Sequence, residues 1–344
     1  MTKSEFQDML RKWCLADAQG QGELLTLKAD IEFLGERLFD EYKPTKNTAD
    51  GPFGVRLSKW IGSAQDEADQ IKLFRLLKHL FFIGQDDLEA ASRTAFSKHV
   101  LEWLINRLGV NVFSAAAKSQ MEDALTLVRY TGITDSFNLG EFLRINDIHG
   151  HSVRYTWEQE IDDWDQDEFC RRVMRRGIQN EIEKRYLVLL EDFVGSGSQA
   201  ERAIRSAQAI RKTDGTFAYE VLFCPLIICP DGAEWATRLQ VDFPNFHYSP
   251  VLELHDDGFI KPNAVPGENT EFPELRDCLS RLHPTVVGPP PVDQDFGPFG
   301  YQQTGAVFVK YDNCPDNTLP VLHRKRNNFW EPLFRRASRM PINA

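Results

Sequence analysis

Residues 186–199 read Tyr-Leu-Val-Leu-Leu-Glu-Asp-Phe-Val-Gly-Ser-Gly-Ser-Gln. The run from Tyr186 to Leu190 is apolar throughout, which is typical of a central parallel strand covered on both faces. Glu191 and Asp192 follow this run, and a turn with two glycines then leads into a helix predicted to begin near Ser198. The segment therefore predicts a strand, a turn and a helix within an α/β sheet.

The turn from Val194 to Ser198 has the composition of a phosphate-binding loop. Gly195 and Gly197 allow a positive φ and a close approach of the backbone to a ligand. The first free N–H groups of the following helix then point at the bound anion, and Ser196 and Ser198 add hydroxyl donors. The same residues would also form a plain strand-to-helix junction that binds nothing, and this alternative stays open.

Glu191 and Asp192 need a separate role, because two carboxylates beside an anion site would repel the anion. Accepting hydrogen bonds from ribose hydroxyls, or holding Mg²⁺ through water, are the roles that suit them. We therefore expect a phosphorylated ligand with Mg²⁺ bound alongside it. No direct protein cage for a metal is expected.

Two other loop types compete for this signal. A Walker A loop requires Lys followed by Ser or Thr after its last glycine, and this chain has Ser-Gln there. The Rossmann dinucleotide fingerprint is formally met by Gly195, Gly197 and Ala200, with Asp214 at a suitable distance for a ribose contact. That fingerprint normally follows its strand at once, whereas four residues separate Leu190 from the first glycine. A Rossmann-like dinucleotide binder remains an alternative.

Periodicity divides the chain near residue 130. Before this point apolar residues recur at helical spacing, for example at Leu24, Leu27 and Ile31. After it, short apolar runs alternate with helical patterns, which is the order of an α/β sheet. The sequence therefore predicts an N-terminal helical domain at residues 1–130 and a mainly parallel α/β domain at residues 131–344.

The second domain has several expected elements. Strands are predicted at residues 137–145, 186–190, 217–228, 251–254 and 306–310, and helices at residues 165–184 and 198–212. Residues 263–300 are rich in Pro, Gly and acidic side chains and are expected to form neither a strand nor the interior of a helix.

Bulk composition limits the class of protein. The 344 residues contain 42% hydrophobic side chains, enough for a core, and carry a net charge of −11 that opposes general attraction to nucleic acid or anionic membranes. No run of about 18 apolar residues and no secretory signal occur, so a cytoplasmic location is expected. Six cysteines without a CxxC pair argue against a zinc ribbon.

Residues 188–198, Val-Leu-Leu-Glu-Asp-Phe-Val-Gly-Ser-Gly-Ser, resemble the phosphoribosyl-diphosphate loop of type I phosphoribosyltransferases. In that family an apolar strand ends in two acidic residues, and a turn rich in Thr, Ser and Gly cups the 5′-phosphate. The resemblance implies that Glu191 and Asp192 lie by the ribose hydroxyls and that Val194 to Ser198 surround the phosphate. The family's usual Thr-Gly is Ser196-Gly197 here.

Two later stretches resemble the ending of phosphoribosyltransferase-like effectors from bacterial conflict and anti-phage systems. They are Phe299-Gly-Tyr-Gln-Gln-Thr-Gly-Ala-Val-Phe-Val-Lys-Tyr-Asp-Asn-Cys-Pro-Asp-Asn-Thr-Leu-Pro320 and Asn328-Phe-Trp-Glu-Pro-Leu-Phe334. Some of these effectors are associated with retrons or with cyclic-nucleotide signalling. The resemblance, over about residues 131–336, implies a type I phosphoribosyltransferase-like fold and a toxin role. It also implies a partner such as a reverse transcriptase or a nucleotide-signal synthase. A non-catalytic nucleotide-sensing module is the alternative.

Three further sets of residues are candidates. Asp316, Asn317 and Thr318 follow an apolar strand and are expected either to face the same cleft as the glycine loop or to form a simple chain reversal. His149 and His151 lack a nearby third ligand, so no metal site is predicted there. The basic segment 324–339, interleaved with aromatic residues, is expected either to bind nucleic acid or to dock through its aromatics with its arginines solvated.

Overall fold

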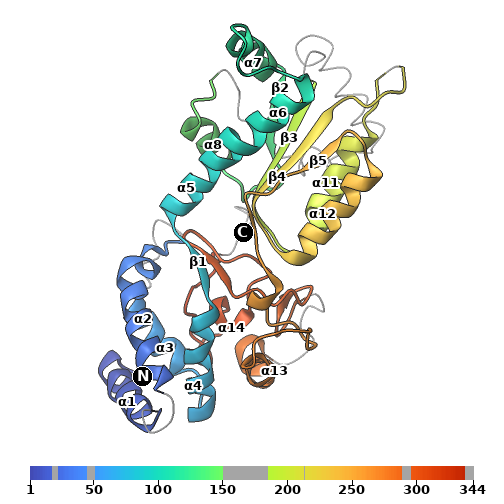
Figure 1. Cartoon of the computed structure of the whole chain (residues 1–344). Helices are drawn as coiled ribbons and strands as arrows, with labels where there is room; N and C mark the ends of the chain where they lie inside the picture. Colours follow the sequence, from blue (N-terminus) through green and yellow to red (C-terminus); the bar gives the residue numbers. More distant parts are fainter. Residues whose placement is uncertain (18–21, 45–50, 150–184, 213, 289–295, 338–344) are drawn as a thin grey trace, which may run out of the picture. The chain divides into compact units, whose positions relative to one another are not determined.

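The computed structural model describes residues 1–17, 22–44, 51–149, 185–212, 214–288 and 296–337 (Figure 1). By their contacts these residues fall into two units, Asp86–Leu254 and Met1–Gln85 with His255–Ala344. We call them the sheet unit and the terminal unit. This division by contacts does not fall at residue 130. The domain limits expected from the sequence, 1–130 and 131–344, stay a prediction.

The sheet unit is built on four parallel strands. In spatial order these are β2 (Val128–Gly132), β3 (Tyr186–Val194), β4 (Glu220–Ile228) and β5 (Phe246–Tyr248), with β6 (Leu252–Glu253) also pairing with β4. Leu187 of β3 lies opposite Arg129 on one side and Val221 on the other. The prediction that this apolar run forms an interior parallel strand is confirmed.

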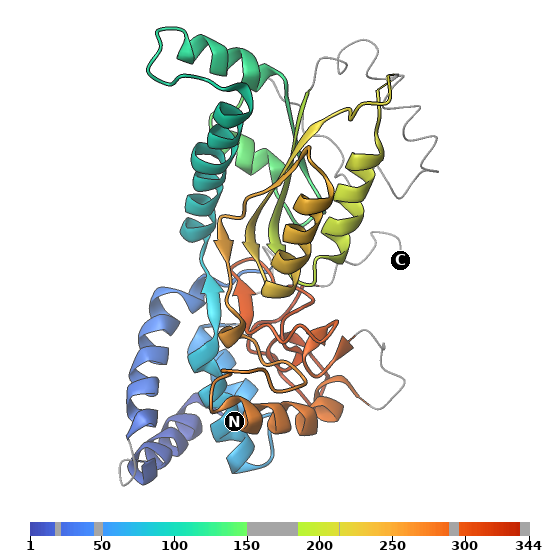
Figure 2. The same ribbon diagram turned by 45° about the vertical axis from the view of Figure 1, so that its right-hand side comes forward.

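Helices cover both faces of this sheet. On one face lie α11 (Ser198–Ala209) and α12 (Pro230–Asp242); on the other lie α5 (Gln85–Thr94), a π-helical turn (Ala95–Val100) and α6 (Leu101–Leu108) (Figures 1 and 2). Ala203, Ile204 and Ala207 of α11 pack on Leu187 and Leu189 of β3. Burial on both faces explains why the strand is apolar at every position. Helices α7 (Ala117–Thr126) and α8 (Leu139–Ile145) flank β2 in the chain.

The terminal unit joins residues from both ends of the chain in one core. Its helices are α1 (Lys3–Asp17), α2 (Glu23–Arg37), α3 (Phe53–Ile61), α4 (Glu67–Leu76), α13 (Phe272–Val287) and α14 (Pro320–His323), with 3₁₀ turns at Phe39–Glu41, Leu77–His79 and Asp256–Gly258. Strand β1 (Phe81–Ile83) pairs in parallel with β9 (Phe308–Lys310), and β7 (Phe296–Gly297) pairs antiparallel with β8 (Gly300–Tyr301). Trp60 and Trp330, both buried, donate to the same carbonyl of Val321, which ties the first and last segments together.

Two sequence predictions about secondary structure are wrong. Residues 137–145, expected to be a strand, contain helix α8, which Asn138 caps by accepting from the N–H of Glu141. Residues 263–300 contain the sixteen-residue helix α13. Pro273 lies in the first turn, where a missing N–H costs little, whereas Pro284 lies inside the helix. The apolar residues of α13 follow helical spacing. The helix expected at residues 165–184 lies outside the described residues.

Four other expected elements are present with shifted limits. The strands expected at 217–228, 251–254 and 306–310 appear as β4, β6 and β9, and the helix expected at 198–212 appears as α11. The architecture is mixed α/β with parallel strands and a helical N-terminal region, as predicted. Among the described residues no helix is both long and apolar enough to span a membrane.

Candidate functional site

Glu191 and Asp192 lie inside β3, which continues to Val194, and not beyond its end as the sequence suggested. Both side chains are buried, with exposed fractions of 4% and 5%. The turn of Gly195, Ser196 and Gly197 follows β3 directly, and α11 begins at Ser198 as predicted. The two carboxyls and the turn therefore sit at the carboxyl end of an interior strand, the edge where open α/β sheets bind ligands.

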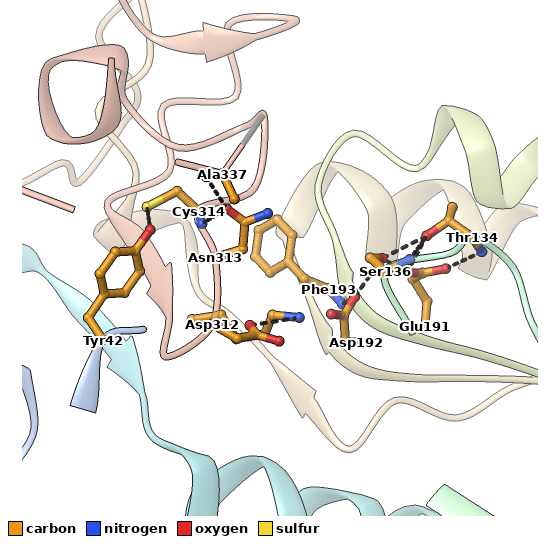
Figure 3. A network of polar contacts seen from close by, with 11 residues as sticks. Tyr42, Thr134, Ser136, Glu191, Asp192, Phe193, Asp312, Asn313, Cys314 and Ala337 are labelled. Carbon is orange, nitrogen blue, oxygen red and sulfur yellow. Dashed lines mark hydrogen bonds and ion pairs between the residues drawn. The ribbon is translucent and has the colours of Figure 1, made fainter. Parts of the chain in front are cut away.

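A short loop between β2 and α8 holds the two carboxyls (Figure 3). Glu191 accepts three hydrogen bonds: from the N–H of Thr134 at 2.8 Å, from the Thr134 hydroxyl at 2.8 Å and from the Ser136 hydroxyl at 2.6 Å. The Ser136 hydroxyl also lies 3.1 Å from Asp192 Oδ1, which accepts from the N–H of Phe193 at 2.8 Å. One serine hydroxyl thus bridges two buried carboxyl groups.

Burial raises the pKa of Glu191, and the neighbouring Asp192 carboxyl raises it further. The hydroxyls of Ser136 and Thr134 act in the opposite direction, because they stabilise the ionised form. The raised direction agrees with the geometry: a hydroxyl carries a single proton, so Ser136 can donate to only one carboxyl at a time. A protonated Glu191 removes the repulsion between two buried carboxylates.

The glycine turn is shaped partly by α12. Gly197 has a φ of 83°, and a Cβ placed on it would lie 3.2 Å from the Cα of Gly232 and 3.4 Å from the ring of Trp235. The sequence assigned this glycine to the approach of a phosphate, but here it is already required by backbone conformation and by packing. A bulky substitution at Gly197 would damage the fold and would be a poor probe of ligand binding.

The first turn of α11 has no side-chain cap, because its N-cap is Gly197. The opening N–H groups of a helix lack intrahelical partners and favour an anion. Ser196 is half-buried and Ser198 exposed, with their hydroxyl oxygens 3.4 Å apart. These features suit the expected phosphate contact, which stays a prediction for Val194, Gly195, Ser196, Gly197 and Ser198.

The structure agrees with one feature of a Rossmann dinucleotide site and disagrees with another. Because β3 extends to Val194, Gly195 follows the strand at once, so the expected gap does not exist. Asp214, however, lies in the connection that leads from α11 to the start of β4, and its carboxyl accepts from the N–H and the hydroxyl of Thr216. In parallel strands this places Asp214 at the opposite edge of the sheet from the glycine turn, away from any ribose bound there.

Among the described residues no group of three or more His, Cys, Asp or Glu side chains is arranged to hold a metal ion. His149 is exposed, and His151 lies outside the described residues.

Asp316, Asn317 and Thr318 have partners within the terminal unit. Asp316 forms an ion pair with Arg336, and the Asn317 amide donates to the Thr304 hydroxyl at 2.8 Å. The Thr318 hydroxyl is fully buried and donates at 2.6 Å to a carbonyl of β9. These contacts support the chain-reversal alternative, and a cleft shared with the glycine turn stays a prediction.

Two aromatic residues dock the described part of the basic segment, residues 324–337, into the core, which agrees with the docking alternative. Trp330 and Phe334 are buried at 1% and 0% exposure. Arg326 lies 4.1 Å from the centre of the Phe329 ring and donates to two backbone carbonyls of α13, and Lys325 pairs with a neighbouring glutamate. Nucleic-acid binding by this segment stays a prediction.

Sequence reasoning missed Thr134 and Ser136. The signal was weak, because Thr-Asp-Ser follows the run Val-Arg-Tyr-Thr-Gly-Ile at residues 128–133, in which polar residues interrupt the apolar ones. That run was interpreted as the boundary between domains and not as strand β2. Since β2 and β3 are neighbouring parallel strands, their carboxyl ends bring this loop to Glu191.

Comparison with protein families gives a match to PRTase-CE over residues 57–336, well over half of the chain and inclusive of β2, β3 and the glycine turn. Comparisons with curated proteins and with solved structures gave no match. The parallel α/β sheet with an acidic pair before a glycine turn agrees with the resemblance found in the sequence. The chain therefore belongs to PRTase-CE, a family of phosphoribosyltransferase-like conflict effectors.

Proposed function

We propose that this chain binds phosphoribosyl diphosphate, or a nucleotide, through residues 191–198 and acts as a toxic effector in bacterial anti-phage defence. The observation that carries the proposal is the buried pair Glu191 and Asp192 placed directly before a glycine turn and an uncapped helix start. Membership of the PRTase-CE family supports the effector role. The partner would be another product of the same defence system, such as a reverse transcriptase or a nucleotide-signal synthase.

The two halves of the site would hold different parts of the ligand. The carboxyls of Glu191 and Asp192 accept hydrogen bonds from sugar hydroxyls, while the N–H groups from Gly195 to Ser198 hold the phosphate. Anchoring a sugar at both ends fixes the anomeric carbon relative to an acceptor. Loss of diphosphate from such a sugar develops positive charge on the ring, which the neighbouring carboxylate of Asp192 would stabilise.

Mg²⁺ fits this arrangement as a companion of the ligand. Carboxylate and phosphate oxygens are its preferred partners, and it commonly keeps several waters and few protein ligands. Asp192 would reach the ion through water. Bound Mg²⁺ would neutralise the diphosphate and so assist its departure.

The test is Asp192→Asn, with Mg²⁺-dependent binding of phosphoribosyl diphosphate measured by calorimetry. Loss of one charge-assisted hydrogen bond, about 1.5–3 kcal/mol, should weaken binding about ten- to a hundredfold. Glu234→Gln is the matched control, because it removes the same charge from the exposed surface of α12. Melting curves verify that both variants are folded.

Equal affinity in the wild type, Asp192→Asn and Glu234→Gln would contradict the proposed site. Release of diphosphate in the same samples separates an enzyme from a nucleotide sensor, since a sensor binds the ligand and leaves it intact. If binding is lost but toxicity in cells survives, the effector activity lies outside residues 191–198.

A further inference from the structure

The Ser136 hydroxyl lies within hydrogen-bonding distance of three side-chain oxygens. Its oxygen lies 2.6 Å from Glu191 Oε1, 3.1 Å from Asp192 Oδ1 and 2.7 Å from the Thr134 hydroxyl (Figure 3). Two of these neighbours are carboxyl oxygens from consecutive residues of one strand. A hydroxyl at this point therefore satisfies both carboxyls at once, either by donating or by accepting.

A sugar hydroxyl bound by Glu191 and Asp192 would have to occupy the same place. Both carboxyls are 4–5% exposed, and the hydroxyls that contact them come from residues 134–136 of the β2–α8 loop. While Ser136 is hydrogen-bonded to them, its hydroxyl occupies the position between Glu191 Oε1 and Asp192 Oδ1 that a ligand hydroxyl bridging the pair would take. The described state is thus one in which a protein hydroxyl takes the position of a ligand hydroxyl.

The fold allows Ser136 to leave without unfolding the loop. Ile133 and Phe137, on either side of the loop, are 1% and 7% exposed and anchor it. Between them, Asp135 is exposed and Ser136 is half-buried. A rotation about χ1 of Ser136 would withdraw its hydroxyl, and the Glu191 carboxyl would keep the N–H of Thr134 as a donor.

We propose that Ser136 is an internal occupant of the sugar-hydroxyl site, and that ligands carrying two adjacent hydroxyls enter by displacing the Ser136 and Thr134 hydroxyls from the carboxyl pair. The inference rests on the proposed function of residues 191–198 and adds its regulation. Ligand affinity is then reduced by the fraction of molecules in which Ser136 covers the carboxyls. Ligands without hydroxyls gain nothing at this position and are indifferent to Ser136.

Ser136→Ala removes the occupant and should tighten binding of phosphoribosyl diphosphate with Mg²⁺ about three- to tenfold, because the covering hydrogen bonds no longer compete. Ser136→Thr keeps the hydroxyl and should bind within about twofold of the wild type. Ser97→Ala is the matched control, since Ser97 is exposed and bonds only to a carbonyl of its own helical segment. Inorganic pyrophosphate, which has no sugar hydroxyls, is titrated alongside.

Tighter binding by Ser136→Ala for the sugar ligand, with pyrophosphate unchanged, would support the proposal. Weaker or unchanged binding by a folded Ser136→Ala would overturn it, while the proposed function stands. Weaker binding would show that the hydroxyl positions the carboxyls for the ligand, and unchanged binding that it neither competes nor positions. No binding of phosphoribosyl diphosphate by either protein would overturn both the proposed function and this inference.

Discussion

The terminal unit and the sheet unit each bury charged groups, and they satisfy them differently. In the terminal unit the Arg56 guanidinium is 4% exposed and donates to the carbonyls of Leu333 at 3.0 Å and Phe39 at 2.6 Å. Three aromatic rings stand 5.3–5.6 Å from it, those of Tyr42, Phe53 and Phe334. In the sheet unit the buried carboxyls of Glu191 and Asp192 are held largely by the hydroxyls of a loop.

The difference separates a charge whose partners are fixed by the fold from charges whose partners a proposed ligand could replace. Arg56 donates to the backbone carbonyls of Phe39 and Leu333 and lies 3.9 Å from a carboxyl oxygen of Asp40. A ligand has no means of replacing the two carbonyls. The partners of Glu191 include side-chain hydroxyls that rotate, and a sugar hydroxyl offers the same chemistry. Arg56 therefore stabilises the fold, whereas the carboxyl pair is suited to exchange its partners for those of a ligand.

Arg56→Met should have the largest effect on stability. It leaves two buried carbonyl oxygens without their charged donor and should lower the free energy of unfolding by about 3–5 kcal/mol. Arg37→Met, on the exposed face of α2, should change it by less than about 0.5 kcal/mol. Urea unfolding followed by tryptophan fluorescence measures both. A small loss for Arg56→Met would show that the buried guanidinium is not structural.

The two units should also respond to pH with opposite sign. Burial lowers the pKa of His323 to about 3, whereas burial raises the pKa of Glu191. The unfolded chain takes up the histidine proton near pH 6.5 and the folded chain does not, so stability is lost as pH falls from 6.5 toward 3. Glu191 acts in the other direction. The unfolded chain loses the Glu191 proton near the ordinary pKa of a glutamate and the folded chain keeps it, so stability is lost as pH rises above that pKa.

The measurement is urea unfolding at pH 7, 6 and 5 for the wild type and His323→Gln. The substitution removes proton uptake by one group, so the loss of stability below pH 6.5 should be smaller by up to about 1.4 kcal/mol per pH unit. The contribution of Glu191 to the pH dependence is the same in both proteins and cancels in the comparison. Parallel pH profiles would mean that His323 is protonated in the folded protein.

A pair of glycines tests how far packing against α12 contributes to the requirement for glycine at residue 197. Gly197 and Gly215 have nearly the same φ, 83° and 81°, but only Gly197 faces atoms of α12. Substitution by Ala should cost about 1 kcal/mol at Gly215, from backbone strain alone, and about 1 kcal/mol more at Gly197. Equal melting shifts for the two variants would remove the packing argument and leave the positive φ as the structural reason for glycine at residue 197.

The local pattern of the site was predictable, and its surroundings were not. Leu187 to Leu190 and the two glycines specify a strand and a turn through local rules, so the sequence located them. Thr134 and Ser136 are 57 and 55 residues away from Glu191 and meet it only through strand pairing, which no local rule reports. The helix α13 was missed because a proline in a first turn looks like a breaker when its position is unknown.

The core of the terminal unit was unpredictable for the same reason. Trp60 and Trp330 donate to the same carbonyl although 270 residues separate them in the sequence. Neither segment contains a local pattern that predicts this contact. Periodicity predicted helices in the N-terminal part of the chain. It could not show that the first and last parts of the chain are buried against each other.

Hydrogen exchange at the amides of residues 195–199 tests whether this turn binds the phosphate of the ligand. The account predicts that phosphoribosyl diphosphate with Mg²⁺ slows exchange at these amides, because the phosphate accepts their hydrogens, while Mg²⁺ alone leaves them unchanged. Protection should be reduced in Asp192→Asn at the same ligand concentration. Unchanged exchange at residues 195–199 under saturating ligand, or protection confined to other parts of the chain, would contradict the assignment of this turn as the phosphate site.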